Sequence, residues 1–157
     1  MQTAAKTMKR VTLELGGKSA NVVFADCDLD RAIAAAPMGV FDNTGQDCCA
    51  RSRILVERSI FKEFTTGFLS ATESLRIGDP SDPETQLGPL ISREHRERVA
   101  SFLVEPNLET TAVGKIPDGP GFWMTPHVVI NPGRDSRIVK EEVFGPVVAI
   151  LPFDGEA

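Results

Sequence analysis

The sequence predicts an α/β fold in which helices flank a mostly parallel sheet. Two observations support this class. Short β-prone runs at residues 21–24 and 54–56 alternate with helical segments that follow each of them. Glycine-containing turns separate these elements, as expected at the ends of buried strands. The order of strand, helix, strand and helix favours crossover connections, which place neighbouring strands parallel and cover the sheet with helices on both faces.

The first third of the chain contains two candidate strands and one helix. Residues 11–15 (Val-Thr-Leu-Glu-Leu) and 21–24 (Asn-Val-Val-Phe) are β-prone, and we expect both to be buried strands. Asp28 is a suitable N-cap for a helix that begins at Leu29, because a short side-chain oxygen can accept from a free backbone N–H of the first turn. The alanine-rich body through Ala36 has high intrinsic helix propensity.

The middle of the chain carries a turn, a strand and an amphipathic helix. Residues 43–47 (Asn-Thr-Gly-Gln-Asp) are polar and contain a glycine, so they predict a turn that places Cys48 at a helix-to-strand junction. Residues 54–56 form the next predicted strand. Apolar residues then recur at a spacing near multiples of 3.6, which indicates one face of a helix: Ile60, Phe64, Phe68 and Leu75.

The last third is less periodic. Residues 94–104 combine charges with an apolar stripe, which is typical of a surface helix. Residues 105–124 are rich in proline and glycine and predict connecting loops around a short strand at 111–113. Further strands are predicted at 127–130 and 147–151, and the sequence contains no internal repeat.

Composition limits the classes of function. The chain has 157 residues, of which 41% are apolar, and 22 acidic against 17 basic residues give a net charge of −5. The basic residues are scattered, so we expect no nucleic-acid partner. No apolar run is long enough to cross a bilayer or to form a signal-peptide core, so we expect a soluble, cytoplasmic protein without membrane contact.

The three cysteines fit a reducing compartment better than a disulfide framework. Cys48 and Cys49 are adjacent, and adjacent cysteines do not easily form an ordinary structural disulfide. The two histidines, His95 and His127, lie at no ligand spacing from the cysteines. We therefore expect no metal site.

Cys48 and Glu14 are the residues whose surroundings favour chemistry. A thiol beside a glycine turn at an element boundary can be reached by a small substrate, whereas a cysteine that is merely a small core residue cannot. A carboxylate at a strand end, followed by Gly16 and Gly17, is a candidate base for it, although a solvated strand-end carboxylate has the same pattern. Taken alone, each residue leaves both interpretations open.

Three segments together carry a more specific resemblance. Residues 14–19 (Glu-Leu-Gly-Gly-Lys-Ser), 41–48 (Phe-Asp-Asn-Thr-Gly-Gln-Asp-Cys) and 141–146 (Glu-Glu-Val-Phe-Gly-Pro) occur in this order. They resemble the glutamate signature, the cysteine signature and the cofactor-contact motif of the NAD(P)-dependent aldehyde dehydrogenase superfamily. The likeness extends over residues 10–153, and it implies a fold like that of the family's catalytic domain.

The resemblance implies a reaction and its cofactor. Cys48, two residues after Gln46, would be the nucleophile that forms a thioester, and Glu14 would be the base that activates water. The cofactor would be NAD or NADP, the substrate a small aldehyde and the product a carboxylic acid. Six residues would contact the cofactor: Leu15 and Gly16 beside the nicotinamide, Glu142 on its ribose, Phe144 near the ring, and His95 and Arg98 on a helix that reaches the ribose.

The resemblance also implies how the chain is divided. Residues 1–15 would be the end of the cofactor-binding domain with a crossover strand, and residues 16–157 would be a partial catalytic (thiol) domain. Family members are several times longer, so we expect a segment of a longer parent enzyme that forms homodimers or homotetramers. Two alternatives stay open: a truncated, catalytically inactive fragment without nucleotide binding, and a cysteine-dependent esterase that needs no nucleotide.

Overall fold

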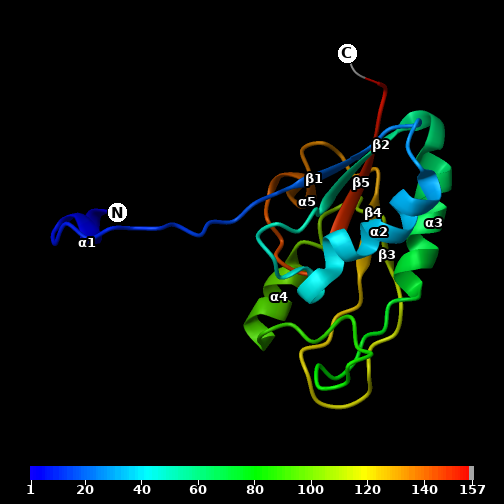
Figure 1. The fold of residues 1–157 in the computed structure, drawn as a ribbon. Helices are drawn as coiled ribbons and strands as arrows, with labels where there is room; N and C mark the ends of the chain where they lie inside the picture. The colour runs from blue at the N-terminus through cyan, green and yellow to red at the C-terminus, as the bar shows by residue number, and fades with distance from the viewer. Residues whose placement is uncertain (156–157) are drawn as a thin grey trace.

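The computed structural model describes residues 1–155, and a five-stranded sheet forms its centre. The strands are β1 (Ala20–Val23), β2 (Arg53–Glu57), β3 (Thr110–Ala112), β4 (His127–Ile130) and β5 (Val147–Phe153). They lie in the order β1-β2-β5-β4-β3, and every neighbouring pair is parallel except β3 with β4. The predicted α/β class and the mostly parallel sheet are therefore confirmed (Figure 1).

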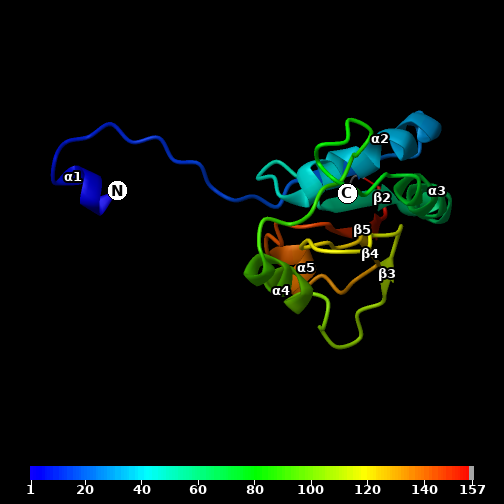
Figure 2. The same cartoon turned by 90° about the horizontal axis from the view of Figure 1, so that it is seen from below.

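Helices cover both faces of this sheet. Helices α2 (Leu29–Phe41) and α3 (Phe61–Glu73) pack on one face, and α4 (Arg93–Ser101) and α5 (Arg137–Lys140) lie on the other (Figure 2). Successive side chains of a strand point to opposite faces. Accordingly, Val148 and Ile150 of β5 join the apolar cluster under α2 and α3, whereas Val147, Ala149 and Leu151 join the cluster under α4 and α5. Strand β5 is thus buried on both faces.

The helix predictions of the first half are confirmed. The Asp28 side chain accepts a hydrogen bond from the backbone N–H of Arg31 at 3.1 Å, which caps α2 as expected. The helix continues past Pro37 as far as Phe41. In α3, the side chains of Phe64 and Phe68 are fully buried against α2 and the sheet. The 3.6-residue spacing therefore identified the buried face correctly.

The remaining predicted elements are present with shifted ends. The surface helix predicted at 94–104 is α4, and the strand predicted at 111–113 is β3, one residue earlier. The structure adds two helices of four residues that the sequence analysis missed, α1 (Gln2–Ala5) and α5. Within residues 1–155, no helix combines the length and the apolar character that crossing a membrane requires.

The strand expected at residues 11–15 is wrong. These five residues have no regular secondary structure, and Leu13 and Leu15 are 55% and 71% exposed. They lie on a segment that extends away from the sheet before the chain enters β1 (Figure 1). A β-prone run becomes a strand only when a neighbour supplies its hydrogen bonds, and no strand among the described residues pairs with this one. Local propensity alone could not reveal that.

The core assignment can be tested with two isoleucines. Ile54 in β2 is fully buried, whereas Ile91 is 80% exposed. We expect Ile54→Ala to lower the free energy of unfolding by about 2–5 kcal/mol, because it removes buried apolar area and leaves a cavity. The matched variant Ile91→Ala should change it by less than about 0.5 kcal/mol. Urea denaturation of both variants measures this, and equal losses would contradict the described core.

Candidate active site

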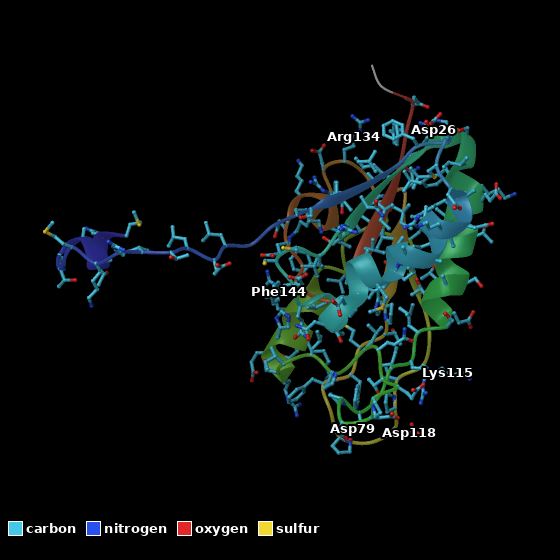
Figure 3. The ribbon with its side chains drawn as sticks, in the orientation of Figure 1. Asp26, Asp79, Lys115, Asp118, Arg134 and Phe144 are labelled. Atoms are coloured by element: carbon cyan, nitrogen blue, oxygen red, sulfur yellow. The ribbon has the colours of Figure 1, made fainter. Side chains whose placement is uncertain are left out.

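The three motif segments meet at one end of the sheet, where strands β1, β2 and β5 begin. We call this end the site edge of the sheet. Each segment lies a few residues or fewer before a parallel strand, and β1, β2 and β5 are direct neighbours. The backbone N–H of Arg53 donates to the carbonyl of Ser19 at 3.3 Å, and that of Ala149 donates to the carbonyl of Ser52 at 3.0 Å. The amino ends of the three strands are therefore in register. Figure 3 shows Phe144 at this edge and Asp26, which follows β1, at the opposite end of the strands.

Two glycines let the first segment pass between the other two. The backbone N–H of Gly17 donates to Oε1 of Glu142 at 3.0 Å. A Cβ atom on Gly16 would lie 2.1 Å from the other carboxylate oxygen of Glu142, and a Cβ on Gly17 would lie 2.7 Å from the carbonyl oxygen of Cys48. Neither position accepts a side chain without movement. The close approach to the Cys48 backbone thus requires glycine at position 17, whereas a side chain at position 16 would displace the Glu142 carboxylate.

The turn before Cys48 has a backbone that few residues adopt. Asn43, Thr44 and Gly45 all have positive φ angles, of 48°, 59° and 71°. The hydroxyl of Thr44, which is buried, donates to the carbonyl of Gly88 at 2.9 Å. A Cβ on Gly45 would lie 2.2 Å from the carbonyl oxygen of Gly145, so the second and third segments also touch here. The turn predicted from the sequence is confirmed, and tertiary contacts hold its unusual conformation.

The amide side chain of Gln46 ties this turn to the loop before α4. Its Nε2 donates to the carbonyl of Asn43 at 3.1 Å, and its Oε1 accepts from the backbone N–H of Ile91 at 3.0 Å. Gln46 was quoted in the sequence only as a landmark for Cys48. Its role in fixing the turn becomes visible only when the loop from another part of the chain lies beside it.

Cys48 has an accessible thiol at this edge. Its side chain is exposed, and its Sγ lies 3.8 Å from the Sγ of Cys49. Contact with the Cys49 thiol raises the pKa of Cys48, and partial loss of hydration and the Asp47 carboxylate raise it further. The surroundings therefore favour the neutral thiol, and nucleophilic chemistry at this sulfur requires a base.

Glu14 is exposed on the extended segment, two residues before Gly16. The residues that the structure describes offer its side chain no hydrogen bond. The glycines that follow it contact Glu142 and the Cys48 backbone, whereas Glu14 itself lies on the part of the segment that extends away from the sheet (Figure 1). Its action as a base, and that of Cys48 as a nucleophile, stay predictions.

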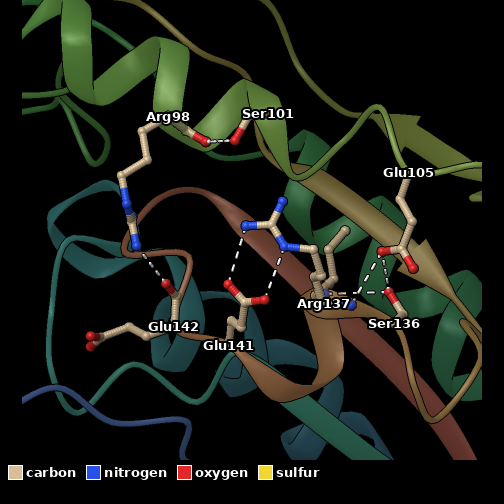
Figure 4. A network of polar contacts seen from close by, with 8 residues as sticks. Arg98, Ser101, Glu105, Ser136, Arg137, Glu141 and Glu142 are labelled. Carbon is tan, nitrogen blue, oxygen red and sulfur yellow. Dashed lines mark hydrogen bonds and ion pairs between the residues drawn. The ribbon is translucent and has the colours of Figure 1, made fainter.

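Helix α4 holds the third segment through backbone contacts. The guanidinium of Arg98 donates to the carbonyl of Val143 at 2.7 Å. It also donates to the carbonyl of Glu142 at 3.1 Å (Figure 4). Nε2 of His95 lies 2.6 Å from the carbonyl oxygen of Phe144, in the position of an N–H donor. Phe144 itself has a positive φ of 59° and is 37% exposed. His95 and Arg98 thus orient the loop that presents Glu142 and Phe144, and their expected contact with a ribose stays a prediction.

A second set of polar contacts secures the same loop from its other side. Arg137 forms a two-point ion pair with Glu141, with N–O distances of 2.9 and 3.1 Å (Figure 4). The same guanidinium lies 4.4 Å above the ring of Phe102, and it lowers the pKa of Glu141. The hydroxyl of Ser136, which caps α5, donates to Glu105 at 2.7 Å. Glu141 therefore anchors the loop, while its neighbour Glu142 faces the first segment.

Lys18 is a residue of the site that the sequence analysis did not single out. Its Nζ is buried and has no hydrogen-bond partner in the described part of the chain. Burial lowers the pKa of Lys18 from 10.5 to about 8, the Arg53 guanidinium lowers it too, and the Glu142 carboxylate opposes both effects. Its place inside the first motif was the available hint, but its burial depends on segments far away in the sequence.

Comparisons with known proteins identify the family of this chain. A family model described as "Aldehyde dehydrogenase family" matches residues 1–157. The chain is 43% identical to 2-hydroxymuconic semialdehyde dehydrogenase of Pseudomonas putida and 43% identical to human 4-trimethylaminobutyraldehyde dehydrogenase. These alignments cover 99% and 100% of this chain but 34% of each relative. The chain thus spans about a third of the length of these relatives.

Solved structures show the same likeness. An NAD-dependent aldehyde dehydrogenase from Sinorhizobium meliloti superposes with a TM-score of 0.91 at 37% identity, over 98% of this chain and 31% of that one. Aldehyde dehydrogenase C from Pseudomonas syringae, solved as a mutant with NAD+ and octanal, gives a TM-score of 0.88 at 32% identity, over 98% of this chain and 33% of that one.

The buried amine of Lys18 predicts a pH dependence of stability. Because its pKa is lower in the folded chain than in the unfolded one, the unfolded state binds more protons between about pH 8 and 10.5, and stability rises with pH across that window. We expect Lys18→Met to be more stable than the wild type at pH 7, by about 1–3 kcal/mol. This difference should shrink towards pH 10. Denaturant unfolding at several pH values measures it, with exposed Lys62→Met as the control.

A constant difference between Lys18→Met and the wild type over this pH range would contradict the description of Lys18 as a buried amine. A Lys62→Met profile that matches that of Lys18→Met would contradict it equally.

Proposed function

Because this chain belongs to the aldehyde dehydrogenase family, we propose that the whole protein oxidises a small aldehyde to a carboxylic acid with NAD or NADP, and that Cys48 is its nucleophile. One observation carries the proposal: the glycine pair, the cysteine turn and the Glu142 loop meet at one edge of the sheet, with the Cys48 thiol exposed there. The activity belongs to the whole protein, since the chain spans about a third of its relatives.

Cys48 performs the first step. Its thiol first gives its proton to solvent; the thiolate then adds to the carbonyl carbon of the aldehyde, a carbon–sulfur bond forms, and the carbonyl oxygen becomes an oxyanion. The backbone N–H of Cys48 is a donor for that oxyanion. Collapse of the tetrahedral adduct breaks the carbon–hydrogen bond and leaves a thioester on Cys48. When bound, the nicotinamide cofactor supplies the hydride acceptor.

Glu14 performs the second step. Its carboxylate takes a proton from a water molecule as that water attacks the thioester carbon, and the carbon–sulfur bond then breaks to release the acid and the Cys48 thiolate. A carboxylate can serve in this way because water does not have to be deprotonated in advance. Gly16 and Gly17, which follow Glu14, let this segment lie against Glu142 and the Cys48 backbone.

The residues near Glu142 fit a nicotinamide riboside. Oε1 of Glu142 accepts from Gly17, which leaves Oε2 free to accept from a ribose hydroxyl. Leu15 and Phe144 are exposed apolar side chains close in sequence to the contact between Gly17 and Glu142, and they suit the face of a flat ring. Gly16 has no side chain that would cover the Glu142 carboxylate. Two solved relatives contain NAD+, which supports this class of cofactor.

His95 and Arg98 belong to the same proposed cofactor site. Both side chains contact backbone carbonyls of residues 142–144, so they orient Glu142 and Phe144. Because His95 and Arg98 contact this loop, their side chains can also reach a ribose that is bound by Glu142. We assign them to cofactor binding, with orientation of the loop as their main contribution.

The proposed division of the chain follows from the same edge. Residues 1–15 belong to the end of the cofactor-binding domain, and residues 16–157 belong to the catalytic domain. The sheet begins only at Ala20, and the exposed Val11, Leu13 and Leu15 precede it, which supports a boundary near Gly16. The whole protein is a homo-oligomer in this proposal.

The nucleophile is tested by exchanging each of the adjacent cysteines. We expect Cys48→Ser in the whole protein to lose more than about 1,000-fold in kcat, since a hydroxyl without activation is a much weaker nucleophile than a thiolate. Cys49→Ser should keep most of the activity. Absorbance of the reduced cofactor with a short aldehyde measures both. Activity in Cys48→Ser, or an equal loss in Cys49→Ser, would overturn the assignment.

The base is tested by the timing of product formation. We expect Glu14→Gln to lower steady turnover by about 100-fold or more, as loss of a general base does. A burst of reduced cofactor should remain, because thioester formation precedes the step that needs Glu14. Stopped-flow absorbance separates the two phases, and Glu63→Gln on α3 is the exposed control. Wild-type steady turnover in Glu14→Gln would refute this role.

A further inference from the structure

The two adjacent cysteines form, with Asp47, an arrangement of metal ligands. The sulfur atoms of Cys48 and Cys49 are 3.8 Å apart, and one carboxylate oxygen of Asp47 lies within 4.8 Å of both. We propose that Asp47, Cys48 and Cys49 bind a thiophilic divalent cation such as Zn²⁺ or Cd²⁺. The sequence analysis expected no metal site because neither histidine had ligand spacing, but this site uses no histidine.

The distance between the sulfurs suits a tetrahedral ion. Zinc–sulfur bonds are about 2.3 Å long, and at the tetrahedral angle two such bonds separate their sulfur atoms by about 3.8 Å. The Sγ–Sγ separation of 3.8 Å in the structure matches this value. A linear two-coordinate ion would need the sulfurs about 4.6 Å apart, twice the bond length. The geometry therefore selects ions that accept tetrahedral ligands.

The backbone already holds the three ligands on one turn. The N–H of Ala50 donates to the carbonyl of Asp47 at 3.2 Å, which closes a turn with Cys48 and Cys49 at its two central positions. The N–H of Cys49 donates to Oδ1 of Asp47 at 3.1 Å, so the carboxylate is held beside the thiols. Binding thus requires little rearrangement of the main chain, which lowers its entropic cost.

An ion can reach this turn. Both cysteines are exposed, and a hollow beside Cys49 is lined by Asp42, Asp47 and Arg51, among others. Two carboxylates against one guanidinium leave this surface favourable to a cation. Binding releases one proton from each thiol to the solvent, and the two thiolates with the Asp47 carboxylate then outweigh the double charge of the ion. A water molecule is the natural fourth ligand.

The bound ion has a consequence for the reaction. It occupies the sulfur lone pair that Cys48 would use to attack an aldehyde, so the metal acts as a reversible inhibitor of the whole protein. This consequence rests on the proposed function of Cys48, whereas the binding itself does not. As the second thiolate ligand of the ion, Cys49 thereby controls whether the Cys48 sulfur is free to react with an aldehyde.

The experiment titrates the reduced chain with Cd²⁺ and records the ultraviolet charge-transfer absorption of cadmium–thiolate bonds, together with calorimetry. We expect one equivalent to bind the wild type and Cys27→Ser equally, since Cys27 is a free exposed cysteine outside the site. Cys48→Ser and Cys49→Ser should each lose the thiolate absorption of a two-sulfur site and weaken binding at least about tenfold, and Asp47→Asn should weaken it less.

Three results would overturn the proposal: no binding by the wild type, unchanged binding by Cys49→Ser, or the same loss in Cys27→Ser. A separate assay of the whole protein tests inhibition, which should occur in the wild type and be at least about tenfold weaker in Cys49→Ser. If Cys48 proves not to be the nucleophile while Cd²⁺ still binds, the proposed function fails and the metal site stands.

Discussion

The parallel register of β1, β2 and β5 is the constraint on which the site depends. The three motif segments are separated by tens of residues, and each precedes one of these neighbouring strands. Hydrogen bonds between Ser19 and Arg53, and between Ser52 and Ala149, align the amino ends of the strands. Because parallel strands present their amino ends on the same side, one register places all three segments together. A slip of one residue would turn every side chain of the strand to the other face.

Glycines and long-range contacts together shape this end of the sheet. Gly16, Gly17 and Gly45 lie where a Cβ atom would collide with Glu142, Cys48 or Gly145. The loop that carries Glu142 is held from two sides, by Arg98 of α4 and by the pair of Arg137 with Glu141. The site is therefore preorganised by contacts outside it, which is what precise placement of reacting groups requires.

Both proposals place their chemistry on the same turn. Its two central residues are Cys48, the proposed nucleophile, and Cys49, and their thiols lie at the separation expected for two ligands of a tetrahedral ion. The contact between the two thiols also raises the pKa of Cys48, so the sulfur needs help to become a nucleophile. Under the two proposals, substrate and cation compete for the Cys48 sulfur, and Cys49 affects both.

The sequence by itself determined the α/β class, most strands and the buried face of α3, because apolar periodicity reports which side of an element is buried, as at Phe64 and Phe68. The motif order also identified the segments of the candidate site. Only the tertiary structure decided that residues 11–15 form no strand, that Lys18 is buried and that the two thiols stand 3.8 Å apart. Each of these depends on a partner distant along the chain or on a fixed backbone turn, and local sequence encodes neither.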